Sequence, residues 1–146
     1  MAAANSRSNP WYASNVPVYS TIGAEGLIFT GELPSDAIPA YLDAADALVS
    51  PRSSGTNTPL KIYQYLRSGR AIVATRLLTH TQVLSDEIAI LTEPTAAGFA
   101  RGILQAINDP AAAARIGGAA KRLAETRYTY EAYLQRTREA CAALVA

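Results

Sequence analysis

The residues best suited to chemistry lie in one segment, a polar loop followed by a helix, between Pro51 and Gly69. Thr58 and Pro59 predict the start of the helix, because a threonine oxygen can cap a first turn and the missing proline N–H would be unpaired there anyway. The unpaired N–H groups from Thr58 to Lys61 and the positive end of the helix dipole would attract an anion, the dipole contributing about 0.3 to 1 kcal/mol. The segment therefore predicts a phosphate site.

The same segment has a plainer interpretation. A loop rich in Ser, Gly and Thr before a helix often serves only to turn the chain. Taken alone, the loop favours this structural interpretation over a binding site. The decision depends on the elements around it.

Short apolar runs separated by helical patterns indicate a parallel sheet. Such strands are buried on both faces and do not alternate apolar with polar residues. Ligands bind at the carboxyl ends of these strands, and the polar loop follows directly after one of them. The predicted strands are Leu27–Thr30, Ala47–Ser50, Ala71–Thr75 and Ile88–Leu91, with a possible edge strand in Val16–Gly23.

The helices are predicted from caps and from helical spacing. The first predicted helix starts near Ser35, and the second runs from Thr58 to about Ser68, with Gly69 closing its last turn. A short helix covers Thr81 to Leu84, one helix lies on each side of Asn108–Pro110, and the last helix starts near Tyr130. The last helix has an apolar face, which predicts that Cys141 is a buried core thiol. That face consists of Tyr130, Tyr133, Leu134, Thr137, Cys141 and Leu144.

Composition limits the classes of protein. The 146 residues are 49% hydrophobic and 17% charged, which suits one domain with one core. We expect residues 1–15 to be disordered and residues 16–146 to form the domain. A formal charge of +1 gives no electrostatic footprint for nucleic acid.

The reactive residues are few. One cysteine cannot form a Cys-based metal cluster, one histidine leaves metal coordination poorly supplied, and neither a metal nor a cofactor is expected. No apolar run approaches the roughly 18 to 20 residues that span a bilayer, so no transmembrane segment is predicted. A reducing, cytoplasmic location fits this composition.

Three stretches together are far more specific than any single motif. LIFTGELPSDAIPAYLDAADALVSP, TPLKIYQYLRSGRAIVAT and VLSDEIAILTEP closely resemble the C-terminal, donor-binding domain of retaining GT-B glycosyltransferases. The resemblance covers roughly Leu27 to Tyr130. Its landmarks are Phe29, Gly31, Ala45, Asp46, Pro51, Gly69 and the strand from Ala71.

The resemblance implies a site for the diphosphate of a nucleotide-sugar donor. Backbone N–H groups around Thr58 and Leu60 would bind it, and Lys61 would assist. The family has two glutamates eight positions apart, the first contacting the sugar's hydroxyls and the second the ribose, and these positions correspond to Thr56 and Gln64. Gln64 can still hydrogen-bond a ribose hydroxyl, but without charge assistance. Thr56 is too short to replace a glutamate. The implied donor-binding residues are Ser54, Gly55, Thr56, Thr58, Pro59, Leu60, Lys61 and Gln64.

The resemblance also implies missing parts. GT-B enzymes hold the acceptor on a second, N-terminal domain, for which this chain has no room, and the family's first two strands should precede Leu27. The Rossmann-like sheet is therefore expected to be truncated. Either Val16–Ile22 repacks against it, or its exposed edge pairs with another molecule, which predicts a homo-oligomer or a partner chain that supplies the acceptor domain.

Two functions remain open. The chain is either a donor-binding fragment of a glycosyltransferase, not catalytically complete alone, or a non-catalytic binding or assembly module with the same fold. A flavodoxin-like signalling domain ranks last, because it would need acidic strand ends where Thr30, Gly31 and Ser50 stand. His80 invites a role as catalytic base, but an exposed loop histidine is the favoured interpretation. No catalytic residue is assigned.

Overall fold

The computed structural model describes residue 28, residue 30 and residues 32–145. The predicted segment 1–15 and the possible strand Val16–Gly23 lie outside the described residues. The chain divides into two compact units, Met1–Ala45 and Asp46–Ala146, and each is described by itself.

The first unit contains helix α2, Ile38–Ala44, which has Pro39 in its first turn. This helix begins three residues later than predicted, after a turn in which the N–H of Ala37 donates to the carbonyl of Pro34. The predicted strand at Leu27–Thr30 is wrong for its described residues, since Ile28 and Thr30 are not in a strand. A four-residue segment forms a strand only when a neighbour pairs with its backbone, and none of the described strands does.

The second unit is built on a three-stranded parallel sheet in the order β1-β2-β3. The strands are β1, Ala47–Ser50, β2, Ala71–Thr75, and β3, Ile90–Thr92. The predicted bounds of β1 and β2 are confirmed, while β3 begins two residues later than predicted. All five residues of β2 are buried, as expected for a central strand between two helical layers.

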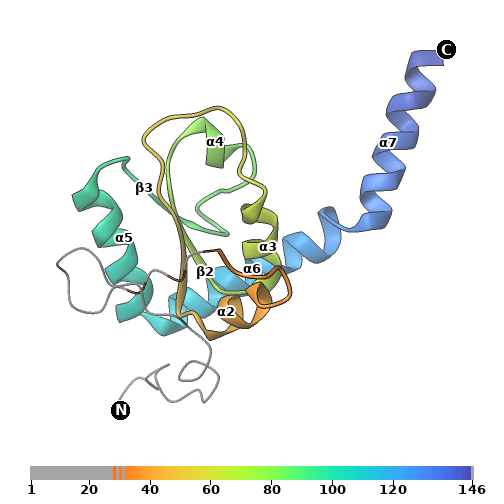
Figure 1. Ribbon diagram of the computed structural model, residues 1–146. Coiled ribbons are helices and arrows are strands. Elements are labelled where there is room, and N and C mark those ends of the chain that lie inside the picture. Colours follow the sequence, from red (N-terminus) through yellow and green to blue (C-terminus); the bar gives the residue numbers. More distant parts are fainter. Residues whose placement is uncertain (1–27, 29, 31, 146) are drawn as a thin grey trace. The chain divides into compact units, whose positions relative to one another are not determined.

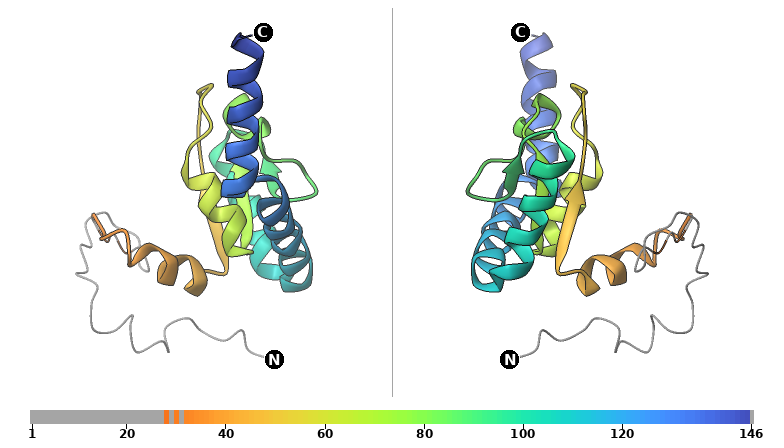
Figure 2. Two further views of the ribbon diagram at one scale, coloured as in Figure 1. Left: turned by 90° about the vertical axis from the view of Figure 1, so that its right-hand side faces the viewer. Right: turned by 90° about the vertical axis from the view of Figure 1, so that its left-hand side faces the viewer.

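Helices cover the two faces of this sheet (Figure 1). Helix α3, Lys61–Ser68, packs Ile62 and Leu66 against Ile72 on one face, and helix α5, Ala96–Asn108, packs against the other. Helix α6, Pro110–Arg127, contributes to both apolar clusters through different turns. The side views show β1 at one edge of the sheet (Figure 2).

A close contact between two glycines fixes α6 against the turn from α3 to β2. Gly69 ends α3 in the left-handed conformation with φ of 73°, as predicted, and its carbonyl lies directly against Gly117 of α6. A Cβ at Gly117 would overlap the Gly69 carbonyl oxygen and lie 2.8 Å from its carbon. Glycine at position 117 is what permits this approach.

The remaining helices differ in how they pack. Helix α4, Leu78–Thr81, lies three residues earlier than predicted and contains the buried residues Thr79 and His80. Helix α7, Tyr130–Val145, extends away from the sheet (Figure 1). None of the described helices is both long and apolar enough to cross a membrane.

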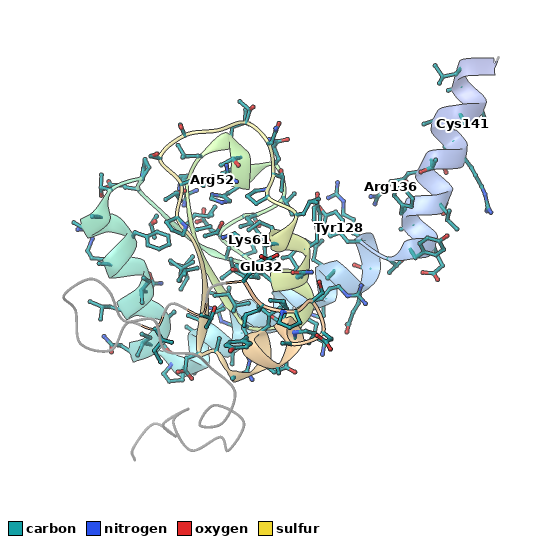
Figure 3. All side chains as sticks on the ribbon, viewed as in Figure 1. Glu32, Arg52, Lys61, Tyr128, Arg136 and Cys141 are labelled. Carbon is teal, nitrogen blue, oxygen red and sulfur yellow. The ribbon has the colours of Figure 1, made fainter. Side chains whose placement is uncertain are left out.

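The prediction that Cys141 is a core thiol is wrong, because its side chain is exposed. Figure 3 shows it on the distal part of α7. Helical spacing of apolar residues shows that a helix has an apolar face, but not that the same domain covers it.

Candidate functional site

Three buried hydroxyl side chains mark the carboxyl ends of the parallel strands. Ser50, Thr75 and Thr92 end β1, β2 and β3 and are at most 8% exposed. Buried hydroxyl groups need hydrogen-bond partners, because an unpaired polar group out of water costs free energy. For Ser50 and Thr75, these partners lie in the segments that follow β1 and β2.

His80 joins the ends of β1 and β2. Its Nε2 lies 3.0 Å from Ser50 Oγ, and its Nδ1 lies 2.8 Å from the Thr75 carbonyl oxygen. Because a carbonyl oxygen only accepts, the neutral ring has its proton on Nδ1, and Ser50 donates to Nε2. The favoured interpretation of His80 as an exposed loop residue is wrong, since its side chain is fully buried.

This burial also governs the charge of His80. Removal from water lowers the pKa of the imidazole below its ordinary 6.5, as do the positive charges of Arg52 and Lys61, while the hydrogen bond to Thr75 opposes the shift. His80 is therefore a neutral structural link at neutral pH. A buried ring with both nitrogens engaged is also poorly placed to act as a catalytic base.

The loop between β1 and α3 is held by long-range hydrogen bonds. The backbone N–H of Arg52 donates to Thr75 Oγ1 at 3.2 Å, which fixes the start of the loop. Farther along, Thr79 Oγ1 donates to the Asn57 carbonyl at 2.5 Å, and Gln82 Nε2 donates to the Thr56 carbonyl. The loop is thus attached to the segment that follows β2, more than 20 residues away in the sequence.

The first turn of α3 starts later than predicted. Leu60, not Thr58, is the N-cap residue, and no side chain caps the helix. The reason is a tighter turn at Pro59, where the N–H of Ile62 bonds to the Pro59 carbonyl and that of Tyr63 bonds to the Leu60 carbonyl. Across the described part of the chain, nothing accepts from the N–H groups of Leu60 and Lys61, which remain available for an anion.

Two cations lie beside this turn, Arg52 on the loop and Lys61 on α3 (Figure 3). Partial burial lowers the pKa of Lys61, and the charge of Arg52 lowers it further. Neither side chain has an ion-pair partner among the described residues. Two neighbouring cations without a counter-charge form a site that an anion would stabilise.

A pocket of ≈ 490 Å³ opens at the same end of the sheet, on the α5 face. Phe99 and Ile103 of α5 form its apolar wall, and Arg52 reaches it from the loop. None of the eight predicted donor-binding residues lines it. The predicted phosphate site and this pocket are therefore distinct, although the loop before α3 contributes Arg52 to the lining of the pocket.

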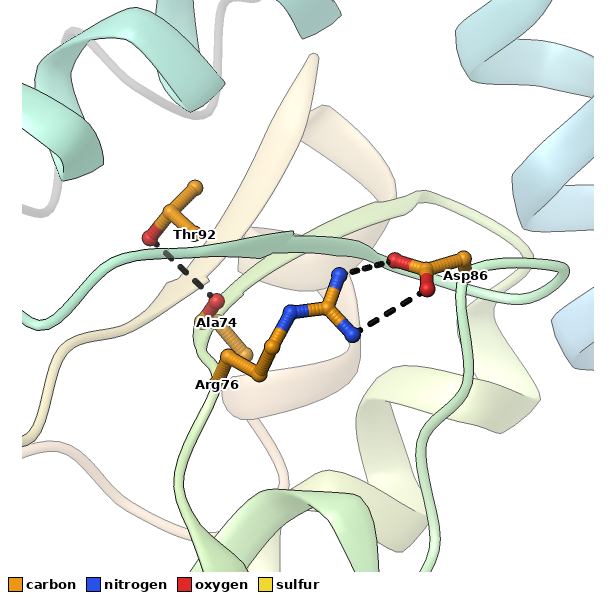
Figure 4. A network of polar contacts seen from close by, with 4 residues as sticks. All are labelled: Ala74, Arg76, Asp86 and Thr92. Atoms are coloured by element: carbon orange, nitrogen blue, oxygen red, sulfur yellow. Dashed lines mark hydrogen bonds and ion pairs between the residues drawn. The ribbon is translucent and has the colours of Figure 1, made fainter.

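An exposed ion pair links the residue after β2 to the segment before β3 (Figure 4). Both terminal nitrogens of Arg76 contact Asp86, at 3.1 and 2.5 Å, and Thr92 Oγ1 donates to the Ala74 carbonyl at 3.4 Å. The hydrogen bond from Arg76 lowers the pKa of the Asp86 carboxyl. This contact fixes the start of the segment that contains α4.

The structure brings the predicted donor-binding residues together in one continuous loop and helix. Ser54, Gly55 and Thr56 are exposed in the loop, Thr58 and Pro59 are half-buried, and Leu60, Lys61 and Gln64 are exposed at or near the start of α3. Gly55 has φ of 127°, a conformation that disfavours any side chain.

Sequence reasoning missed the residues that hold this loop. Thr79, His80 and Gln82 belong to the run THTQ, a polar stretch that begins four residues after the end of the buried strand β2. That unusual placement was the only signal in the sequence. Arg52 was also missed, because a single arginine in a polar loop does not differ from a solvated one.

Comparison with known proteins identifies the family. The family model described as "Glycosyl transferases group 1" matches residues 9–109, well over half of the chain. The chain belongs to this family. No curated protein sequence matches it significantly.

The fold of this glycosyl transferases group 1 chain matches a solved structure. The crystal structure of HepE from Anabaena in complex with UDP-glucose has a TM-score of 0.67 and 20% sequence identity, over 73% of this chain. The chain corresponds to only 30% of HepE's length. The α/β, Rossmann-like architecture predicted from the sequence is therefore confirmed.

Proposed function

We propose that the chain binds the diphosphate of a nucleotide-sugar donor and provides the donor half of a glycosyltransferase site. The observation that supports this most directly is the placement of Arg52 and Lys61 beside the unpaired N–H groups of α3, without a counter-charge among the described residues. A diphosphate matches this arrangement, because two adjacent anionic groups can occupy a helix N-terminus and two cations together.

Family membership supplies the chemical class. The matching family is one of glycosyl transferases, and the similar HepE structure holds UDP-glucose, a nucleotide sugar. The acceptor and the catalytic group are not assigned to this chain, which spans less than a third of HepE.

Calorimetric titration with uridine diphosphate tests the proposal. We expect saturable binding, weakened roughly tenfold in Lys61→Ala because a charge-assisted contact is lost. The matched control is Lys121→Ala, which removes the sequence's other lysine from the exposed side of α6. Absence of binding at concentrations well above several millimolar, or equal losses in both variants, would reject the proposed site.

Gln64 tests which end of the donor lies on α3. The family resemblance places Gln64 at a position where glutamate contacts the ribose. Gln64→Glu should then tighten uridine diphosphate about fivefold through charge assistance and leave inorganic pyrophosphate unchanged or weaker. Equal effects on both ligands would remove Gln64 from the ribose site.

Helix α7 supports an alternative, non-catalytic assembly role. Tyr130, Tyr133 and Leu144 are 69%, 63% and 87% exposed, a large apolar display for one helix. If α7 or the outer edge of β1 mediates self-association, light scattering at micromolar concentration should give a mass above 15.5 kDa, twice that value for a dimer. A monomer mass would count against this alternative.

A further inference from the structure

The segment after β2 contacts the loop through backbone carbonyls. Thr79 Oγ1 donates to the Asn57 carbonyl, and Gln82 Nε2 donates to the Thr56 carbonyl. Both acceptors belong to consecutive peptide units, 56–57 and 57–58. Figure 1 shows α4 beside this loop, which is drawn in yellow.

Fixing a carbonyl also fixes the N–H on the other side of the peptide bond. In a planar trans peptide the C=O and the N–H point in opposite directions. Because both carbonyls are turned toward α4, the N–H groups of Asn57 and Thr58 are turned away from it. Among the described residues, neither N–H has an acceptor.

We infer that Thr79 and Gln82 are positioning residues that aim the N–H groups of Asn57 and Thr58 at the donor's anionic group. This inference rests on the proposed function. Two consecutive N–H groups that point the same way form an anion-binding concavity of the kind found in phosphate loops. The side chains that create it lie more than 20 residues away and need not touch the ligand.

The support behind Thr79 and Gln82 is rigid. Thr79 is fully buried, and its neighbour His80 is tied to Ser50 and Thr75. On the loop side, Gly55, with φ of 127°, turns the chain just before the two held peptide units. The orientation of the N–H groups is thus set before a ligand arrives, which lowers the entropy cost of binding.

A purely structural role would give the same contacts but different responses to substitution. Thr79→Val keeps the shape and removes the donor, whereas Thr79→Ser keeps the donor and removes a buried methyl group. If the hydroxyl positions the loop, Thr79→Val weakens uridine diphosphate about three- to tenfold, while Thr79→Ser binds within about twofold of the original protein. Thermal stability should fall in both variants.

Gln82 allows a second, independent test of the positioning role. Gln82→Ala should weaken uridine diphosphate by a similar factor, and the exposed Gln105 of α5 supplies the matched control, Gln105→Ala. If affinity follows thermal stability across all four variants, with Thr79→Ser as weak as Thr79→Val, the positioning role is refuted. The affinity of the same variants for inorganic pyrophosphate shows whether the loss concerns the phosphates alone.

Backbone dynamics test the inference without any ligand. NMR order parameters for the N–H groups of Asn57 and Thr58 should be about 0.85 in the original protein and fall toward about 0.6 in Thr79→Val and Gln82→Ala. If the original protein does not bind uridine diphosphate, the proposed function fails, and these order parameters still decide the positioning. Unchanged values in both variants would overturn it.

Discussion

Substituting Gly117 with alanine tests the contact that fixes α6 against the end of α3. A Cβ at this position would overlap the Gly69 carbonyl oxygen and lie 3.0 Å from the carbonyl carbon of Arg70. The obstructing atoms are backbone, so no side-chain rotation relieves them. Either α6 or the turn at Gly69 must move.

Gly118 supplies the matched control one position along the same helix. A Cβ there would meet only Arg122 Nη1, at 3.5 Å, which is an ordinary contact. Gly118→Ala should therefore gain up to about 1 kcal/mol from helix propensity. Gly117→Ala gains the same free energy from helix propensity. Overpacking against the backbone costs about 3 kcal/mol, the upper end of the usual range for such substitutions, so the net loss of stability is about 2 kcal/mol.

The two variants should thus differ by about 3 kcal/mol, since one gains about 1 and the other loses about 2. For a domain of this size, that corresponds to a separation of roughly 10 °C in Tm. Thermal and urea unfolding followed by far-UV circular dichroism measures both quantities. If Gly117→Ala is as stable as Gly118→Ala, the close approach of α6 to the Gly69 carbonyl is refuted.

Three further outcomes follow from the described contacts. Burial lowers the pKa of His80 below 6.5, so below that pH the unfolded chain binds more protons than the folded one. The stability present above about pH 6.5 should therefore fall as the pH drops toward the folded pKa. Urea unfolding at several pH values should show this loss, and His80→Gln should reduce it. Asp109→Ala should lose about 1 kcal/mol in thermal unfolding, because Asp109 Oδ1 caps α6 through the N–H of Ala112 at 2.9 Å. Asp86→Asn should leave Tm almost unchanged, because its ion pair with Arg76 is exposed to solvent.

The sequence predicted best what depends on short-range pattern. The strands Ala47–Ser50 and Ala71–Thr75 were correct because unalternated apolar runs bounded by Pro51 and Gly69 admit few other structures. The start of α3 was misplaced by two residues, since the tight turn at Pro59 competes with capping by Thr58. Boundaries are decided by such small local differences.

Long-range contacts could not be predicted from the sequence. His80 was expected to be exposed, yet it is buried because Ser50, 30 positions away, supplies its second hydrogen bond. The eight donor-binding positions came from a family resemblance and lie in one loop and helix, but their assignment as ligand contacts stays a prediction. Pattern alone could not show which side chains hold that loop, because pairing across the fold leaves no period in the sequence.

Among the residues that the structure describes, the hydrogen bonds that fix the loop come from the second unit, between Ser50 and Gln82. The electrostatic strength of the proposed diphosphate site is limited. Two charge-assisted contacts, from Arg52 and Lys61, contribute roughly 3 to 6 kcal/mol, which corresponds to dissociation constants from several millimolar to tens of micromolar. Tighter binding of uridine diphosphate would require contacts beyond these two cations, either from the backbone N–H groups or from the nucleoside, and the comparison with pyrophosphate would separate the two sources.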